Sequence, residues 1–177
     1  MVKKVVVKLL YGVLFFMALL YFLPKEHLYY LVQQKLQEQK ITLTQKQLRE
    51  TPFGVELQEV SVSYEGVPVA TAKDVSVTLF VFYDAMKAEG IELSSLASSY
   101  LPPKLSFVKA NYSLVHPLTI DAVAQGAFGS LQAAFNFKEK KLQATVKPSH
   151  VLKANYGRSL RYLQRKKDGE YSYAKNF

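Results

Sequence analysis

The stretch Ser106–Val146, which reads SFVKANYSLVHPLTIDAVAQGAFGSLQAAFNFKEKKLQATV, decides the fold. Apolar and polar residues alternate along it in four runs, and each run ends at a turn signal such as His116-Pro117 or the charged tip 138–141. Alternation with a period of two places every second side chain on the same side of a strand. Short turns join antiparallel neighbours. The sequence therefore predicts four strands of an antiparallel sheet with one apolar face.

The apolar face of this predicted sheet has two interpretations. It is either an ordinary core beneath amphipathic helices, or an open surface that shelters the acyl chains of a lipid. Polar residues such as Lys109, Asn111 and Gln132 lie on the opposite face. The candidate lipid-facing or core residues are Val108, Tyr112, Leu114, Ile120, Leu131, Phe135 and Phe137.

The chain before this stretch has the pattern of a β-meander. Residues 41–44, 55–64 and 75–79 alternate, and 51–54 and Glu65-Gly66 are turn signals. The apolar parity changes after Leu57, which predicts a bulge or kink near Gln58-Glu59.

Three further positions in this half carry local signals. Pro68 indicates an edge position or a break in strand pairing. The polar pair Lys73-Asp74 predicts a turn. Residues 80–88, including Phe82, have the spacing of one or two helical turns that end at Gly90.

The C-terminal segment predicts a short helix and a last strand. After Ser149, the apolar residues Tyr156, Leu160 and Leu163 indicate a helix. The turn signal 168–169 then leads into a strand in which Tyr171 and Tyr173 would share one face.

The N-terminal stretch Val5–Leu23, VVVKLLYGVLFFMALLYFL, predicts a membrane anchor. As a helix it would extend about 28 Å, close to the hydrocarbon thickness of a bilayer. The absence of an Ala-x-Ala pattern before Pro24 argues against a cleaved signal peptide. The absence of a polar face argues against a buried core helix. We therefore expect residues 5–23 to span the bilayer.

The charges around the anchor predict its orientation. Lys3, Lys4 and Lys8 precede most of the apolar residues, so the positive-inside rule places residues 1–24 as a cytoplasmic N-terminus and anchor. Residues 25–40 form the next expected unit, an amphipathic helix that either caps the sheet, which we favour, or lies along the membrane. Its apolar positions are Leu28, Leu31, Val32 and Leu36. Residues 41–177 would then form a β-rich domain on the far side of the membrane.

Composition narrows the possible partners. The chain carries 23 Lys and Arg against 14 Asp and Glu, a formal charge of +9, and has no cysteine. Disulfides, thiol chemistry and cysteine zinc sites are therefore excluded. The basic segment 147–175 is either a solvated tail or a surface that approaches anionic headgroups. We expect no nucleic-acid partner.

Catalytic motifs are missing from the sequence. It contains neither a glycine-rich phosphate loop nor a Gly-x-Ser-x-Gly elbow. His27, His116 and His150 are far apart and have no ligands at metal-binding spacing. We therefore expect no catalytic residues, no cofactor, no metal and no enzymatic activity.

The order of motifs resembles one known family. An anchor ends at Leu23-Pro24, a short helix follows, the turn Thr51–Gly54 leads into a strand, and Asp168-Gly169 precedes an aromatic strand. This resembles the type II secretion protein N family and, more loosely, the AsmA-like envelope proteins. The resemblance implies a bacterial inner-membrane protein with a periplasmic, curved β-sheet domain and no catalytic residues. The expected fold class is thus mainly β, with one transmembrane helix, a curved antiparallel sheet and one or two short helices.

Two functional hypotheses follow. The first is a non-enzymatic accessory or scaffold component of an envelope assembly, similar to a type II secretion subunit, that docks partner proteins through sheet edges. The second is a lipid-binding or lipid-transfer protein that holds an acyl chain on its apolar sheet face.

Overall fold

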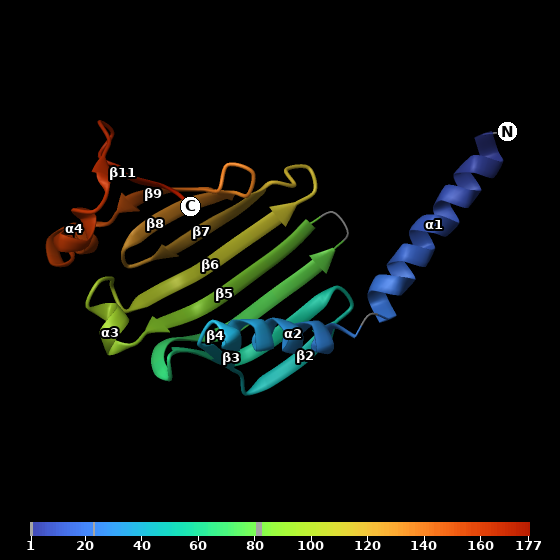
Figure 1. Cartoon of the computed structure of the whole chain (residues 1–177), viewed down its shortest axis with the longest axis horizontal. Coiled ribbons are helices and arrows are strands. Elements are labelled where there is room, and N and C mark those ends of the chain that lie inside the picture. The colour runs from blue at the N-terminus through green and yellow to red at the C-terminus, as the bar shows by residue number, and fades with distance from the viewer. Residues whose placement is uncertain (1, 23, 81–82) are drawn as a thin grey trace.

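The chain folds as one large curved β-sheet with few helices. The computed structural model describes residues 2–22, 24–80 and 83–177, without the side chains of residues 2–4 and 20. Within these residues eleven strands form a single antiparallel sheet (Figure 1). The expectation of a mainly β protein is confirmed.

The elements have the following bounds. The helices are α1 (Val2–Phe22), α2 (Lys25–Glu38), α3 (Ser95–Ser98), α4 (His150–Asn155) and α5 (Gly157–Leu160). The first strands are β1 (Ile41–Thr44), β2 (Gln47–Thr51), β3 (Gly54–Tyr64), β4 (Val67–Phe80) and β5 (Tyr83–Leu93). The later strands are β6 (Lys104–Ser113), β7 (Thr119–Gly126), β8 (Gly129–Asn136), β9 (Lys141–Pro148), β10 (Gln164–Arg165) and β11 (Tyr171–Asn176).

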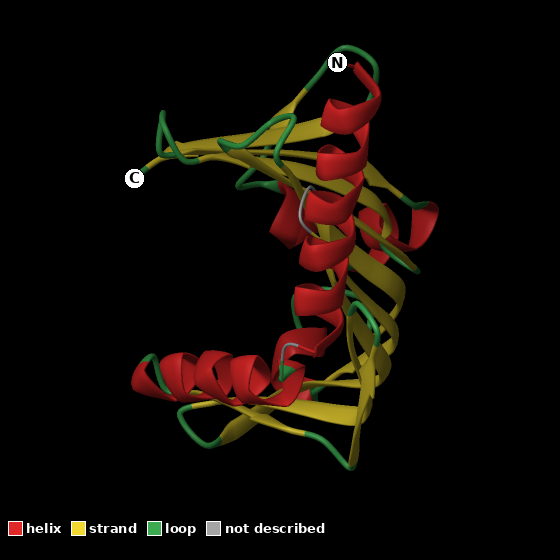
Figure 2. Cartoon of the chain, turned by 90° about the vertical axis from the view of Figure 1, so that its right-hand side faces the viewer, coloured by secondary structure: helices red, strands yellow, loops and turns green. Residues whose placement is uncertain are grey.

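The sheet is a meander for most of its width. From β3 to β9 each strand pairs with the next one in sequence, and β11 and β10 continue the sheet beyond β9. At the other edge both β1 and β2 pair with β3. Figure 2 shows that the sheet curls so that its two edges approach the same side, and that α2 lies inside the curve. The sheet therefore has a concave face and a convex face.

The strand register identifies the residues of the concave face. Directly paired residues of neighbouring strands lie on the same face. One row of paired residues crosses the sheet without a break, and it starts at Leu57, which packs against Tyr29 of α2. The row is Leu57, Val75, Ala88, Val108, Ala124, Leu131, Val146 and Tyr171. Because α2 lies inside the curve, this row belongs to the concave face.

A crease crosses strands β3 to β6. The pairing skips Glu59 and Lys73 between β3 and β4, and it skips Gly90 and Ser106 between β5 and β6. Glu59 and Gly90 have positive φ angles of 50° and 60°. Residues three apart in a straight strand face opposite sides, yet Leu57 and Val60 pack in the same cluster. The predicted kink near Gln58-Glu59 is therefore present, and it keeps apolar side chains on the concave face on both sides of the crease.

The strands of this half contradict two sequence-based predictions and bear out a third. Lys73-Asp74 is not a turn, because β4 runs through it. Residues 83–88 are not helical but belong to β5, which pairs with both β4 and β6, while Phe82 lies outside the described residues. The break in pairing predicted at Pro68 is present, because the β3–β4 register shifts beside its partner Ser63 and the pairing of β4 with β5 starts only at Ala70.

Helix α2 covers the concave face at strands β1 to β3. The side of the helix that packs on the sheet is not the apolar side predicted from the sequence. Tyr29 is 8% exposed and packs on the sheet, whereas Leu28, Leu31 and Val32 are exposed. The Tyr29 hydroxyl donates to Gln45 Oε1 at 2.7 Å. Burial of the ring raises the pKa of the Tyr29 phenol above its usual value.

Helices α4 and α5 cover the opposite end of the concave face. Ser149 caps α4, where its hydroxyl accepts from the Leu152 amide at 3.1 Å. Leu152 and Leu160 are 2% and 7% exposed and pack on Ala124 and Val146. The two helices therefore anchor the main core of the domain to β7 and β9.

Helix α1 projects away from the sheet (Figure 1). It is 21 residues long, and its described side chains from Val5 to Leu19 are exposed. Within the described residues, no helix is both long and apolar enough to cross a membrane. The predicted span 5–23 is not fully covered by the described residues, because Leu23 and the side chain of Leu20 lie outside them.

Candidate functional site

The candidate site is an apolar trough on the concave face, and small side chains form its floor. A second row of paired residues crosses the sheet two positions from the first. On β6 to β9 this row consists entirely of alanine: Ala110, Ala122, Ala133 and Ala144. None of the four is fully buried. The short side chains of these four alanines leave space above the sheet, and no described helix packs on them closely enough to bury them.

Larger side chains line the trough at the end nearest α1. The third row of pairs contains Tyr112, Ile120, Phe135 and Leu142, all half-buried. The ring of Phe135 meets those of Phe137 and Phe177 edge to face, with centroids 5.1 Å and 6.1 Å apart. This aromatic cluster continues the apolar lining to the strand ends.

The seven candidate residues predicted from the sequence fall into two groups. The register places Val108, Tyr112, Ile120, Leu131 and Phe135 on the concave face. Leu114 and Phe137 lie just beyond the ends of β6 and β8, and they are 47% and 46% exposed. The strands therefore hold five of the seven candidates on one face, and two lie outside the strands. The candidate set leaves out the alanines between these residues, because alanine carries a weak apolar signal.

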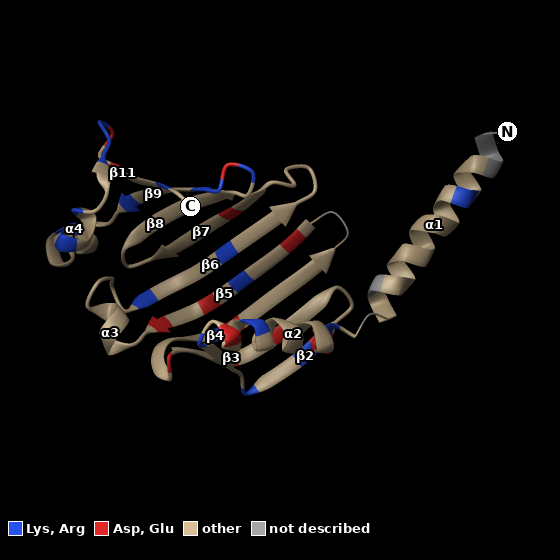
Figure 3. Ribbon diagram, viewed as in Figure 1, with Lys and Arg blue, Asp and Glu red and all other residues tan. Residues whose placement is uncertain are grey.

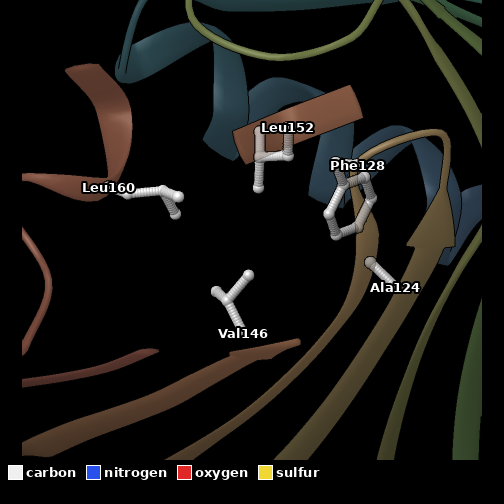
Figure 4. Packing of buried hydrophobic residues seen from close by; sticks show 5 residues of the cluster. All are labelled: Ala124, Phe128, Val146, Leu152 and Leu160. Carbon is white, nitrogen blue, oxygen red and sulfur yellow. The ribbon is translucent and has the colours of Figure 1, made fainter. Parts of the chain in front are cut away.

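The end farthest from α1 contains an apolar cavity. Helices α4 and α5 roof it, and Figure 4 shows Leu152, Leu160, Phe128, Val146 and Ala124 pointing toward a common centre. The cavity has a volume of about 340 Å³, and apart from Ser159 its lining residues are apolar. Ligand pockets for small molecules begin at about 300 Å³.

Helix α2 exposes apolar side chains beside the sheet. The Gln33 amide donates to the Leu43 carbonyl of edge strand β1 at 2.6 Å. A helix turns by about 100° per residue, so Leu28 lies about 140° and Val32 about 100° around the axis of α2 from Gln33. Their exposed side chains therefore point away from the sheet edge.

The convex face is polar and differs clearly from the trough. The side chains of Lys87 and Glu89 on β5 form an ion pair at 2.7 Å, and Lys104 pairs with Glu92 at 3.5 Å. Figure 3 shows these charges along β5 and β6. On β9, farther along the sheet, Lys147 donates to the Glu170 carboxylate at 2.9 Å, and this contact raises the pKa of the Lys147 ammonium group.

The trough carries little polar chemistry. Asp84 is the acidic residue in its third row, and its Oδ1 accepts from the Phe80 amide at 3.1 Å, which fixes the end of β4. Among the described residues, no three His, Asp or Glu side chains gather as a metal site would require. The arrangement suits an apolar ligand held by shape rather than by hydrogen bonds.

Comparison with known proteins found no matching family model, curated protein or solved structure.

Proposed function

We propose that the chain is a non-enzymatic, membrane-anchored protein whose trough binds the acyl chain of a lipid. The observation that carries the proposal is the row Ala110, Ala122, Ala133 and Ala144, which lies on an apolar concave face and remains partly exposed. In a closed core this row would be covered. An acyl chain laid on it would remove apolar surface from water at about 25 cal/mol per Å².

The trough is shaped for a long, flexible apolar ligand. It is lined by aromatic and aliphatic side chains at the α1 end, floored by alanine in the middle, and roofed by α4 and α5 at the far end, where the cavity lies. The polar convex face then keeps the outside of the sheet in water. One apolar and one polar face are the combination that a lipid carrier needs.

The anchor is the second part of the proposal. The described side chains of α1 are apolar apart from Lys8 and the hydroxyls of Tyr11 and Tyr21, and exposed fractions such as 67% for Leu9 and 65% for Phe15 leave them unpacked. Such a surface on a single helix favours a lipid environment. With Lys3 and Lys4 in the cytoplasm, the sheet domain would lie on the periplasmic side of a bacterial inner membrane.

The test is the lipid content of the full chain purified from membranes in mild detergent. Native mass spectrometry should show bound lipid on the wild type. Ala133→Glu places a charge on the trough floor and should reduce the bound fraction several-fold. The matched control is Gln132→Glu, which adds the same charge on the convex face of the same strand.

Two results would contradict lipid binding in the trough. A wild type that carries no lipid, or equal occupancy in Ala133→Glu and Gln132→Glu, would contradict the proposal. If Ala133→Glu fails to fold, Ala122→Gln offers a milder polar change on the same row, with the same expected loss.

A second candidate is the scaffold function, and one observation favours it. Beyond Ser172 the described residues give β11 a partner on one side only, because β10 pairs with Ser172 and Tyr171 alone. An open edge can accept a strand from another protein. Affinity purification from detergent extracts should then recover envelope or secretion-system proteins, and consistent recovery of none would argue against this function.

A further inference from the structure

We propose that the α1 end of the trough rests on the membrane, so that the trough opens directly into the adjacent lipid leaflet. The contact surface, called here the mouth rim, consists of the β6–β7 loop (114–118), the β8–β9 tip (137–141) and Phe177. The assignment of lipid as the cargo rests on the proposed function, whereas the contact with the bilayer rests on the rim alone.

The first observation is the exposure of large apolar side chains in the rim. Val115 is 79% exposed, and Leu114, Leu118 and Phe137 are between 46% and 47% exposed. Phe177 at the chain end is 65% exposed. Apolar side chains that gather on loop tips mark a surface for a membrane or a partner.

The second observation is that the rim is held in shape. In the β6–β7 loop, the Val115 amide donates to Ser113 Oγ at 3.2 Å and the His116 amide donates to the Ser113 carbonyl at 3.0 Å. The Phe137 amide donates to the Leu118 carbonyl at 2.8 Å and so joins the two loops. These bonds satisfy backbone groups that would otherwise oppose insertion into an apolar environment.

The third observation is continuity with the trough. Phe137 belongs to the rim and packs edge to face on Phe135, which lies on the concave face. The Phe177 amide donates to the Lys140 carbonyl at 2.9 Å, which holds the chain end against the same tip. An acyl chain could therefore pass from the rim to the alanine floor without leaving apolar surface.

The fourth observation is charge. The tip carries Lys138, Lys140 and Lys141 against Glu139, and none of these lysines forms an ion pair with a described residue. Figure 3 shows the charges at the end of the β8–β9 hairpin. Unpaired lysines beside apolar side chains fit a surface of anionic headgroups, which commits the rim to a bilayer rather than to a protein partner.

The position of the rim agrees with the proposed anchor. Figure 1 shows the β6–β7 and β8–β9 turns at the end of the sheet nearest α1, and α1 extending beyond that end roughly along the strand direction. A bilayer that α1 crosses would therefore meet the turns at its surface. Helices α4 and α5 lie at the opposite end of the strands.

The absence of tryptophan from the chain makes a clean test possible. Single tryptophans are introduced as Val115→Trp in the rim and as Tyr162→Trp beside α5, where the side chain is 86% exposed. Each full-length variant is reconstituted in phosphatidylglycerol-containing nanodiscs with and without brominated acyl chains. We expect several-fold stronger bromine quenching for Val115→Trp, together with a blue-shifted emission.

Charge reversal tests the role of the lysines. In the Val115→Trp background, Lys138→Glu with Lys140→Glu should weaken quenching several-fold in anionic discs but not in purely zwitterionic ones. Equal weakening in both lipids would overturn the electrostatic part of the proposal.

Other outcomes have distinct meanings. Equal quenching of Val115→Trp and Tyr162→Trp overturns the membrane contact, whatever the lipid occupancy of the trough. Shielding of Val115→Trp from aqueous acrylamide without bromine quenching would place a second copy of the chain on the rim and also overturns it. Strong rim quenching in a chain without bound lipid supports the contact and contradicts only the proposed function.

Discussion

At the scale of single residues, two features stabilise the β1–β4 part of the sheet: the close approach of the Gly54 backbone to β4, and the buried ring of Tyr29. Gly54 begins β3 where this strand passes β4, and an added Cβ would lie 1.8 Å from the Val77 carbonyl oxygen. Only glycine allows this approach, because the obstructing atom belongs to the backbone of a paired strand. The Pro-Phe-Gly turn signal in the sequence marked this position but not the reason for it.

We predict that Gly54→Ala lowers the free energy of unfolding by about 1–3 kcal/mol, since the strands must separate to admit the methyl group. The matched control is Gly157→Ala, where an added Cβ meets nothing within 4 Å. Chemical denaturation in detergent measures both. Equal stability of the two variants would show that β3 and β4 do not approach so closely.

Tyr29 permits a test of how α2 is held. Tyr29→Ala should lower the free energy of unfolding by about 3–5 kcal/mol through loss of the buried ring, and Tyr29→Phe by about 1 kcal/mol through loss of the hydrogen bond to Gln45. Leu31→Ala is the control, because Leu31 is 58% exposed. A larger effect for Leu31→Ala would mean that α2 packs through its apolar stripe after all.

The same residue predicts a pH dependence. Burial raises the pKa of the Tyr29 phenol in the folded state, so its contribution is fully present below the unfolded value of 10.0 and is lost as the pH rises above it. The stability difference between wild type and Tyr29→Phe should therefore shrink above pH 10. Denaturation at pH 8 and pH 10.5 measures it, and a constant difference would contradict the burial.

At the scale of elements, the C-terminal helices are short but carry the main core. Each of α4 and α5 contributes one nearly inaccessible leucine, Leu152 and Leu160, to the cluster over β7 and β9. Helices this short are not stable alone, so packing must hold them in place. The far end of the trough therefore stays roofed only while these side chains remain buried.

We predict that Leu152→Ala lowers the free energy of unfolding by about 2–5 kcal/mol, because it enlarges an existing cavity. Tyr162→Ala, at an exposed position nearby, should change it by less than about 0.5 kcal/mol. Thermal melting followed by circular dichroism distinguishes them. Similar melting temperatures for the two variants would mean that α4 does not roof the cavity.

The same elements show where sequence patterns succeed and fail. Strands β6 to β9 were predictable because strict alternation leaves one interpretation. Strand β5 was not, because Ala85, Met86, Lys87 and Ala88 favour a helix and only pairing with β4 and β6 overrides this preference. Strand β2 was missed because the polar residues Gln47, Arg49 and Glu50 give it no apolar face.

At the scale of the whole molecule, curvature turns a meander into a trough. The alternating pattern predicted an apolar face but left open whether it was covered. The extent of cover depends on contacts between distant segments, namely α2 over β3 and α4 over β9, which no local pattern records. The part between these covers is the candidate site.

The most direct measurement is photo-crosslinking with a phospholipid that carries a diazirine on its acyl chain, in bilayers containing the full-length protein. We expect crosslinked peptides from β6 to β9, at concave residues such as Ala122, Ala133 and Phe135, in addition to those from α1. Crosslinks confined to α1, with none on the sheet, would contradict an open trough that receives lipid.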